Sequence, residues 1–179
     1  MAKEHAAALK GMALCRALSP AELDAIGAIV EMREIAAGKE LFREGDPGDG
    51  LFLVVAGEID IVKRGPRGER SLARLGPGGV LGEMSLITTE PRSATGRAVV
   101  DSRVLHVPVD RFRNRLEGGS TAALRMVAAI AEVLARRLGT MNTMVLELAD
   151  KLDPSGKVLP ELKDTELAEL HRTMQVWSF

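Results

Sequence analysis

The chain has 179 residues, of which 46% are hydrophobic, and its formal net charge at pH 7 is −1. This length fits one domain with an extension, and the small net charge excludes a global field that would attract nucleic acid or anionic lipid. The single cysteine excludes an internal disulfide framework and fits a reducing compartment. No stretch approaches the roughly 18 apolar residues of a membrane helix, so a soluble cytoplasmic protein is expected.

The N-terminal segment, residues 1–30, is predicted to be helical. Residues 3–17 are rich in alanine, although Gly11 weakens a helix in the middle of this run. Ser19 and Glu22 have the spacing of a capping box with Pro20 between them, so a second helix is expected to begin there.

Residues 31–109 have the pattern of a β domain. Short runs rich in Val, Ile and Leu are separated by glycine-containing turns at the spacing of a sandwich or barrel. We therefore predict a mainly β protein with flanking helices, built on an eight-stranded jelly-roll β-barrel. It should carry N-terminal helices, a short helix inserted between two strands and a long C-terminal helix. The clearest runs are 51–56, 58–63, 70–75 and 104–109.

Residues 82–95, with the sequence GEMSLITTEPRSAT, have the composition of an anion site. Gly82 has no Cβ, so a ligand can lie close to the backbone. Glu83 offers a carboxylate to a ribose 2′-hydroxyl. Residues 84–89 are long enough for one or two helical turns, whose free N–H groups would point at an anion.

The second half of this segment adds a cation. Pro91 ends the helical turn because it disfavours a helical conformation in the preceding residue. Arg92 then places a guanidinium beside the anion, where it is able to bind two phosphate oxygens. Ser93 adds a hydroxyl, and Ala94 and Thr95 begin the next strand.

In this order and spacing, the segment resembles the phosphate-binding cassette of the cyclic nucleotide-binding domains. That family includes bacterial catabolite activator regulators, regulatory subunits of the cyclic-AMP-dependent kinase and nucleotide-gated channels. Its cassette runs Gly-Glu-x-x-Leu, a short loop, then Arg-(Ser/Thr/Ala)-Ala-(Ser/Thr). The matching positions here are Gly82, Glu83, Leu86, Arg92, Ser93, Ala94 and Thr95.

The resemblance implies a ligand and a set of binding residues. A 3′,5′-cyclic purine nucleotide would bind at the cassette, including the amides of Met84 and Ser85. Alignment to the family places Leu72, Ala73 and Leu75 in the apolar wall beneath the ribose and base. Ordinary core packing is the other reading, and both can be true. Bacterial regulators with serine after the arginine mostly take cyclic AMP, which favours cyclic AMP over cyclic GMP. A cyclic dinucleotide, or no nucleotide, is the alternative.

From Asp110 the pattern becomes helical. A short helix is predicted to end at Gly118-Gly119, and Ser120 is predicted to cap a long one. Apolar residues of the long helix recur at steps of three and four, which indicates a coiled-coil-like partner and hence a homodimer through residues 120–152. The alternative is packing on the barrel or on the C-terminal tail. This heptad seam comprises Leu124, Val127, Ala131, Leu134, Leu138, Met141, Val145, Leu148 and Leu152.

The long helix also carries a candidate base reader. In the similar bacterial regulators this helix forms the dimer interface and closes over the ligand. Thr140, Met141 and Asn142 align with the positions that contact the purine. The amide of Asn142 can donate and accept along a base edge, but a solvated helix residue is the other reading. Gly139 either allows close helix approach or marks a weak point.

The last predicted regions are the hinge and dimerisation helices, 110–152, and a tail, 153–179. The tail is expected to hold one helix at about 160–175 and ends near Trp177. One helix cannot make a helix-turn-helix, so no DNA binding is expected, and an unknown downstream protein would receive the signal.

Enzymatic activity is not expected. Metal-dependent jelly-roll enzymes use clustered histidines, whereas His5, His106 and His171 lie in separate regions. No pairing of a nucleophile with a base is visible. A single cysteine is also too few for an iron–sulfur cluster.

Overall fold

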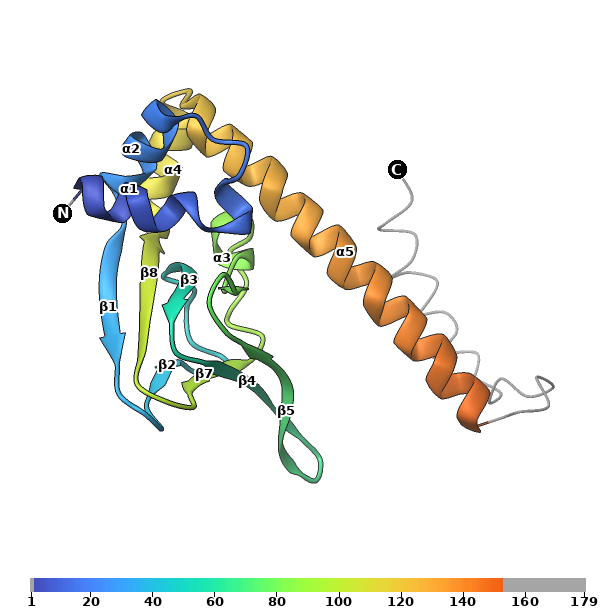
Figure 1. Ribbon diagram of the computed structural model, residues 1–179. Coiled ribbons are helices and arrows are strands. Elements are labelled where there is room, and N and C mark those ends of the chain that lie inside the picture. Colours follow the sequence, from blue (N-terminus) through green and yellow to red (C-terminus); the bar gives the residue numbers. More distant parts are fainter. Residues whose placement is uncertain (1, 153–179) are drawn as a thin grey trace. The chain divides into compact units, whose positions relative to one another are not determined.

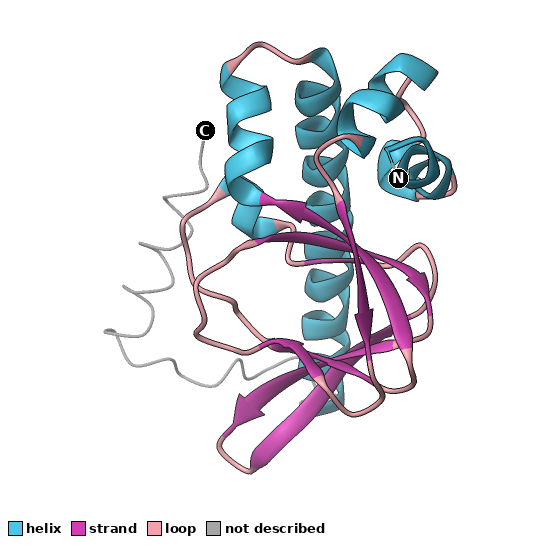
Figure 2. Ribbon diagram, turned by 90° about the vertical axis from the view of Figure 1, so that its left-hand side faces the viewer, coloured by secondary structure: helices cyan, strands magenta, loops and turns pink. Residues whose placement is uncertain are grey.

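The computed structural model describes residues 2–152 and shows two layers of β-strands with the N-terminal helices at one end (Figures 1 and 2). The helices are α1 (Ala2–Lys10), the 3-10 turn η1 (Ala13–Cys15), α2 (Pro20–Gly27), α3 (Met84–Ile87), α4 (Val109–Glu117) and α5 (Thr121–Leu152). The strands are β1 (Glu31–Ile35), β2 (Glu40–Phe42), β3 (Gly50–Ala56), β4 (Ile59–Gly65), β5 (Gly68–Leu75), β6 (Val80–Leu81), β7 (Thr95–Ala98) and β8 (Ser102–Pro108).

The strands form two four-stranded sheets in which all the paired strands are antiparallel. One sheet has the order β1-β8-β3-β6, and the other has the order β2-β7-β4-β5. Strands far apart in the sequence are therefore neighbours, as β1 and β8 are. This arrangement confirms the predicted mainly β jelly roll with flanking helices.

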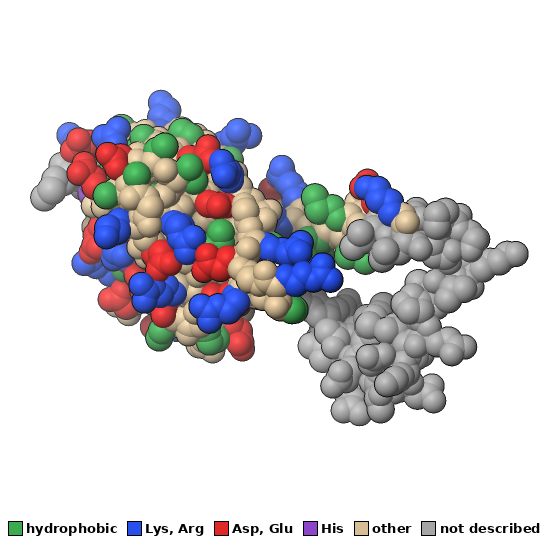
Figure 3. Space-filling view, turned by 90° about the horizontal axis from the view of Figure 1, so that it is seen from below, with side chains coloured by type: hydrophobic (Ala, Val, Ile, Leu, Met, Phe, Trp, Pro, Cys, Tyr) green, Lys and Arg blue, Asp and Glu red, His purple; other side chains and the backbone are tan. Residues whose placement is uncertain are grey.

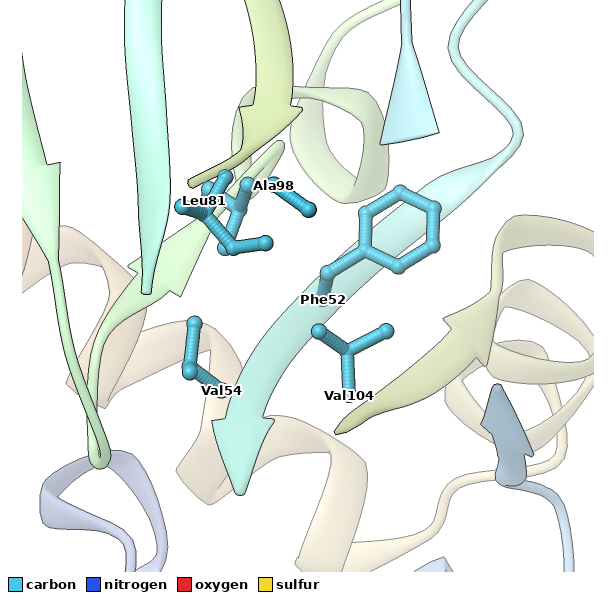
Figure 4. Close-up of a cluster of buried hydrophobic side chains, with 6 residues drawn as sticks. Phe52, Val54, Leu81, Ala98 and Val104 are labelled. Atoms are coloured by element: carbon cyan, nitrogen blue, oxygen red, sulfur yellow. The ribbon is translucent and has the colours of Figure 1, made fainter. Parts of the chain in front are cut away.

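The core lies between the two sheets, where apolar side chains from both layers meet (Figure 4). Burying each large apolar side chain stabilises the fold by about 1.5–3 kcal/mol. This burial holds the short strands of the two sheets together. Half-buried side chains, including Phe42 and Leu75, pack against this cluster. Its members are Phe52, Val54, Ile59, Leu81, Ala98 and Val104.

The N-terminal segment differs from the single helix expected over residues 3–17. Helix α1 ends at Lys10, a turn follows at Gly11, and a separate 3-10 turn forms at Ala13–Cys15. The helix thus ends before Gly11 instead of continuing through it. The capping box of α2 is confirmed: Ser19 Oγ accepts from the Glu22 amide, and Glu22 Oε2 accepts from the Ser19 amide.

The first turns of α5 pack on the N-terminal segment. Ser120 caps the helix, since its Oγ accepts from the Ala123 amide at 3.4 Å. Arg125 donates to the carbonyl oxygen of Ala17 at 2.9 Å and to Glu22 Oε2 at 3.3 Å. Four apolar residues of this part of α5 are buried although they do not belong to the predicted seam. They are Ala122, Ala123, Met126 and Ile130.

Helix α5 crosses a boundary between two units of the chain, residues 1–132 and 133–179. The helix continues through Gly139, whose Cβ position has no neighbour within 4 Å. The predicted helix at 160–175 and Trp177 lie outside the described residues. Among the described residues no single helix is long and apolar enough to cross a membrane; only α4 and α5 taken together, as a bent pair, meet that test of length and composition.

Candidate functional site

The cassette follows β6 and begins with a glycine in a left-handed conformation. Gly82 has φ +69°, and a Cβ there would lie 2.1 Å from Arg92 Nη1. The glycine therefore serves two needs at once, since it permits the turn and leaves room for the guanidinium. Helix α3 follows as a single short turn, closed by the Thr88 amide donating to the carbonyl oxygen of Met84 at 2.7 Å.

Arg92 is the centre of the site, and its side chain is only 2% exposed. Its Nη1 donates to the carbonyl oxygen of Gly82 at 3.2 Å and to Ser85 Oγ at 3.0 Å. Its Nη2 donates to Asp49 Oδ1 at 2.5 Å and to the carbonyl oxygen of Gly50 at 2.7 Å. The buried Nε has no hydrogen-bond partner in the described part of the chain.

Two aromatic rings flank the guanidinium of Arg92. Its Cζ lies 4.3 Å from the ring centre of Phe42 and 5.3 Å from that of Phe52. Burial lowers the pKa of Arg92, while the carboxylates of Asp49 and Glu83 act in the opposite direction. An arginine keeps its charge in proteins, so the site holds a desolvated cation.

The backbone of Arg92 is also held in place. Its amide donates to the carbonyl oxygen of Asp46 at 2.8 Å, and its carbonyl oxygen accepts from the Gly45 amide at 2.9 Å. Both partners belong to the loop between β2 and β3, which also carries Asp49. Backbone hydrogen bonds thus connect this loop to the cassette next to the guanidinium.

The structure brings several other predicted cassette residues together around Arg92. Glu83 and Ser85 are each 5% exposed, and Ser85 binds the guanidinium directly. Ser93 is exposed, and its carbonyl oxygen accepts from Lys63 Nζ at 2.6 Å. Met84 is 42% exposed.

Ala94 and Thr95 lie in or next to β7 and have structural contacts. Ala94 is buried in the core. The hydroxyl of Thr95 accepts from the Glu44 amide at 2.9 Å, which ties β7 to the segment after β2. Thr95 also lines a hollow of about 560 Å³ that is shared with charged residues, including Glu40 and Arg64.

The three predicted wall residues of β5 do not share one environment. The register between β4 and β5 shifts between Ile61 and Val62, so that Leu72 has no partner in the ladder. Such a bulge disrupts the alternation of faces. Leu72 is 60% exposed and Ala73 is exposed, whereas Leu75 is half-buried against the core. A role for these residues beneath a nucleotide stays a prediction.

Asn142 is exposed and belongs to the second unit of the chain. Its role as a base reader stays a prediction. Thr140 donates to the carbonyl oxygen of Arg136 at 3.1 Å, as a hydroxyl within a helix commonly does.

Sequence reasoning did not single out Asp49, which lies in one of the glycine-containing turns between the predicted strands. It lies 43 residues from Arg92 in the sequence. No local sequence pattern predicts an ion pair between residues so far apart. The one signal that pointed to Asp49 was its place, as a carboxylate, in a glycine-rich loop. Within the described residues there is no group of three or more His, Cys, Asp or Glu able to hold a metal ion.

The surface around the second sheet carries interspersed charges of both signs (Figure 3). Arg97 pairs there with Glu40 and Glu69, each at 3.1 Å. Exposed pairs of this kind contribute about 0–1 kcal/mol each, so they define a solvated surface and contrast with the buried Arg92.

Comparison with known proteins identifies this arrangement. Residues 32–118 match the cyclic nucleotide-binding domain family. The N-terminal domain of a transcriptional regulator from Streptomyces coelicolor A3(2) is 31% identical, with a TM-score of 0.65, and the match covers 75% of this chain and 94% of that one. The chain belongs to the cyclic nucleotide-binding domain family.

Other members of this family are bacterial regulators. The catabolite activator protein of Thermus thermophilus has a TM-score of 0.68 at 32% identity, with 76% of this chain and 62% of that chain covered. The cyclic AMP receptor protein of the same species is 40% identical over 98 residues, which are 54% of this chain and 45% of the receptor. A cyclic-AMP-activated global transcriptional regulator of Mycobacterium tuberculosis is 27% identical over 146 residues.

The chain spans less than two thirds of the length of these curated relatives, 45% of the Thermus receptor and 63% of the Mycobacterium regulator. The shared part is a regulatory binding domain. The activities of the whole relatives therefore do not transfer to this chain as findings.

Proposed function

We propose that this protein is a cyclic nucleotide sensor without enzymatic activity of its own, and that its preferred ligand is cyclic AMP. The cyclic phosphate would bind at Arg92, Ser93 and the amides after Gly82. Glu83 would accept a hydrogen bond from the ribose 2′-hydroxyl. Membership of the cyclic nucleotide-binding domain family supports the class of ligand.

The buried guanidinium of Arg92 is the observation that carries this proposal. A desolvated cation is costly unless it is paired, and its Nε has no hydrogen-bond partner among the described residues. Asp49, Glu83 and the two aromatic rings keep the charge in place at low exposure. A phosphate would add charge-assisted hydrogen bonds, which are the strongest kind that such a group makes.

The remaining predicted contacts would complete the ligand site. Ala73 and Leu75 would lie beneath the ribose and base, with Leu72 at the exposed edge. Asn142 would bind the base edge. The choice of cyclic AMP rests on Ser93 after the arginine and on the similarity to the cyclic AMP receptor protein of Thermus thermophilus.

Transmission would begin at the end of the cassette. Arg113 of α4 donates to the carbonyl oxygen of Thr88 at 3.3 Å. A movement of the cassette would therefore displace α4. A hollow of about 320 Å³ lies among the same segments, lined in part by Gly48, Pro91 and Val109, and gives them room to move. We propose that ligand occupancy shifts the population of helix positions and that a cytoplasmic partner protein reads the shift.

Calorimetric titration with cyclic AMP, cyclic GMP and a cyclic dinucleotide tests the proposal. We expect cyclic AMP to bind with micromolar or tighter affinity. Substitution Arg92→Ala should weaken binding tenfold or more, because a hydrogen bond to a charged group contributes about 1.5–3 kcal/mol. Circular dichroism of the variant would establish that it folds.

Arg97→Ala is the matched control, since it removes an arginine of the same domain that pairs with Glu40 and Glu69 at the surface. Its affinity should equal that of the wild type. Unchanged affinity in a folded Arg92→Ala variant would refute the site. Binding of the dinucleotide alone, or of none of the three ligands, would refute the choice of ligand and favour an interaction module of the same fold.

A further inference from the structure

His106 of β8 is a buried histidine next to the phosphate site. It is 2% exposed, and its ring stacks on Phe52 with centres 4.6 Å apart. Its Nε2 lies 3.5 Å from Asp49 Oδ2, and its Nδ1 lies 3.7 Å from Glu31 Oε2. Neither ring nitrogen has a hydrogen-bond partner within the part of the chain that the structure describes. A buried polar group without a partner calls for an explanation.

Asp49 connects this histidine to Arg92. One carboxylate oxygen, Oδ1, binds Arg92 Nη2 at 2.5 Å, and the other, Oδ2, faces the ring of His106 at 3.5 Å. Arg33 Nη1 also lies 3.5 Å from Oδ2. A single carboxylate is thus shared by the phosphate-binding arginine and a titratable ring.

The other charged groups around His106 come from β1 and α4. Glu31 of β1 pairs with Arg33 at 3.5 Å and with Arg111 of α4 at 2.8 Å. Burial lowers the pKa of His106, and the charge of Arg33 lowers it further. The carboxylates of Asp49 and Glu31 raise it in part. The lowered pKa favours the neutral ring, which takes up a proton on acidification.

We propose that His106 is a positioning residue for the phosphate site, and that its protonation strengthens the binding of a cyclic nucleotide at Arg92. This inference rests on the proposed function. The protonated ring donates Nε2–H to Asp49 Oδ2 and draws the carboxylate away from Arg92. One N–H of Arg92 Nη2 is then free for the phosphate, while the other still donates to the carbonyl oxygen of Gly50, and the site carries one more positive charge.

The direction of the pH effect follows from linkage. The phosphodiester of the ligand keeps its single negative charge between pH 5 and pH 8, so the ligand itself contributes no titration in that range. If protonation of His106 strengthens phosphate binding, then phosphate binding must raise the pKa of His106 by the same coupling free energy. Affinity should increase as the pH falls through the pKa of His106.

Affinity measured by calorimetry at several pH values tests this inference. We expect cyclic AMP to bind the wild type about fivefold more tightly at pH 5.5 than at pH 8, at the lower end of ordinary coupling between sites. Variants His106→Gln and His106→Phe should lose this pH dependence. His5→Gln is the matched control and should retain it, since His5 belongs to α1 and its Nδ1 lies 3.3 Å from the carbonyl oxygen of Gly27. A pH dependence that persists in both folded His106 variants would overturn the proposal.

Titration of the histidine rings by NMR provides a readout that needs no ligand. In the free protein, Asp49→Asn should lower the pKa of His106, because it removes a carboxylate 3.5 Å from Nε2. An unchanged pKa would overturn the coupling even if cyclic AMP binds. If no cyclic nucleotide binds at any pH, the proposed function fails, whereas the response of His106 to Asp49→Asn still decides whether the ring and the carboxylate are coupled.

Discussion

At the scale of single residues, burial decides the chemistry of the polar groups in this domain. Arg92 and His106 are both almost fully buried, yet the side chain of Arg92 donates four hydrogen bonds, whereas neither ring nitrogen of His106 has a hydrogen-bond partner among the described residues. The difference follows from their charges. A permanent cation must be paired when it leaves water, whereas an imidazole avoids the same cost by remaining neutral.

The single cysteine gives a prediction at this scale. Cys15 is 2% exposed, and burial raises its pKa to about 12. At pH 8 the reactive thiolate is therefore almost absent in the folded protein. We expect iodoacetamide to label Cys15 very slowly in the native protein and rapidly in urea, as measured by mass spectrometry. Equal rates in the two conditions would show that the N-terminal segment does not bury this residue.

At the scale of elements, glycines decide how closely the strands and the cassette approach one another. Gly50 begins β3 with φ +153°, and a Cβ there would lie 2.2 Å from the carbonyl oxygen of Val107 and 2.6 Å from His106 Nε2. Gly38, with φ +75°, has no atom within 4 Å of its Cβ position. The absence of a side chain at Gly50 allows β3 to approach β8 closely, whereas at Gly38 it only allows the left-handed conformation of a turn.

These two glycines form a matched pair of variants. Gly50→Ala should destabilise the domain by about 3 kcal/mol or more, because the added methyl group overlaps backbone that cannot move easily. Gly38→Ala should cost about 1–2 kcal/mol, since only the left-handed conformation is strained. Urea denaturation followed by circular dichroism measures both. Equal losses would mean that the approach of β3 to β8 is looser than described.

At the scale of the whole molecule, α5 has two apolar stripes, one buried and one exposed. Met126 and Ile130 are fully buried in the first unit of the chain. In the second unit, the seam residues Leu138, Met141 and Val145 are 52%, 61% and 63% exposed. A sustained heptad of exposed apolar residues is typical of a helix that pairs with another helix. We therefore propose a homodimer through α5.

Leu138→Asp tests this dimer, because it would place a charge in the paired seam, where an unpaired buried charge is costly. We expect sedimentation equilibrium to show dimers for the wild type and mainly monomers for this variant. Thr143→Asp is the control, since Thr143 is exposed and lies off the seam. A wild type that is monomeric at micromolar concentration, or a Leu138→Asp variant that remains dimeric, would refute an interface through the seam.

The cassette and the strands could be predicted because their signals are local. Glycine turns, alternating apolar residues, the capping box of Ser19 and the order of Gly82, Glu83 and Arg92 follow from the conformations that those residues allow. The break at Gly11 and the bulge at Leu72 could not be predicted. Each depends on how a short segment packs against neighbours that the local pattern does not specify.

Local patterns in the sequence were enough to predict the jelly roll, the position of the cassette and its central arginine. The groups that surround that arginine depend on the tertiary structure. Asp49 is 43 residues away along the chain and meets Arg92 because its loop, which joins β2 of one sheet to β3 of the other, forms backbone hydrogen bonds with Arg92. His106 reaches the same carboxylate because β8 pairs with β3. Such contacts are set by sheet closure, and no short-range pattern of residues encodes them.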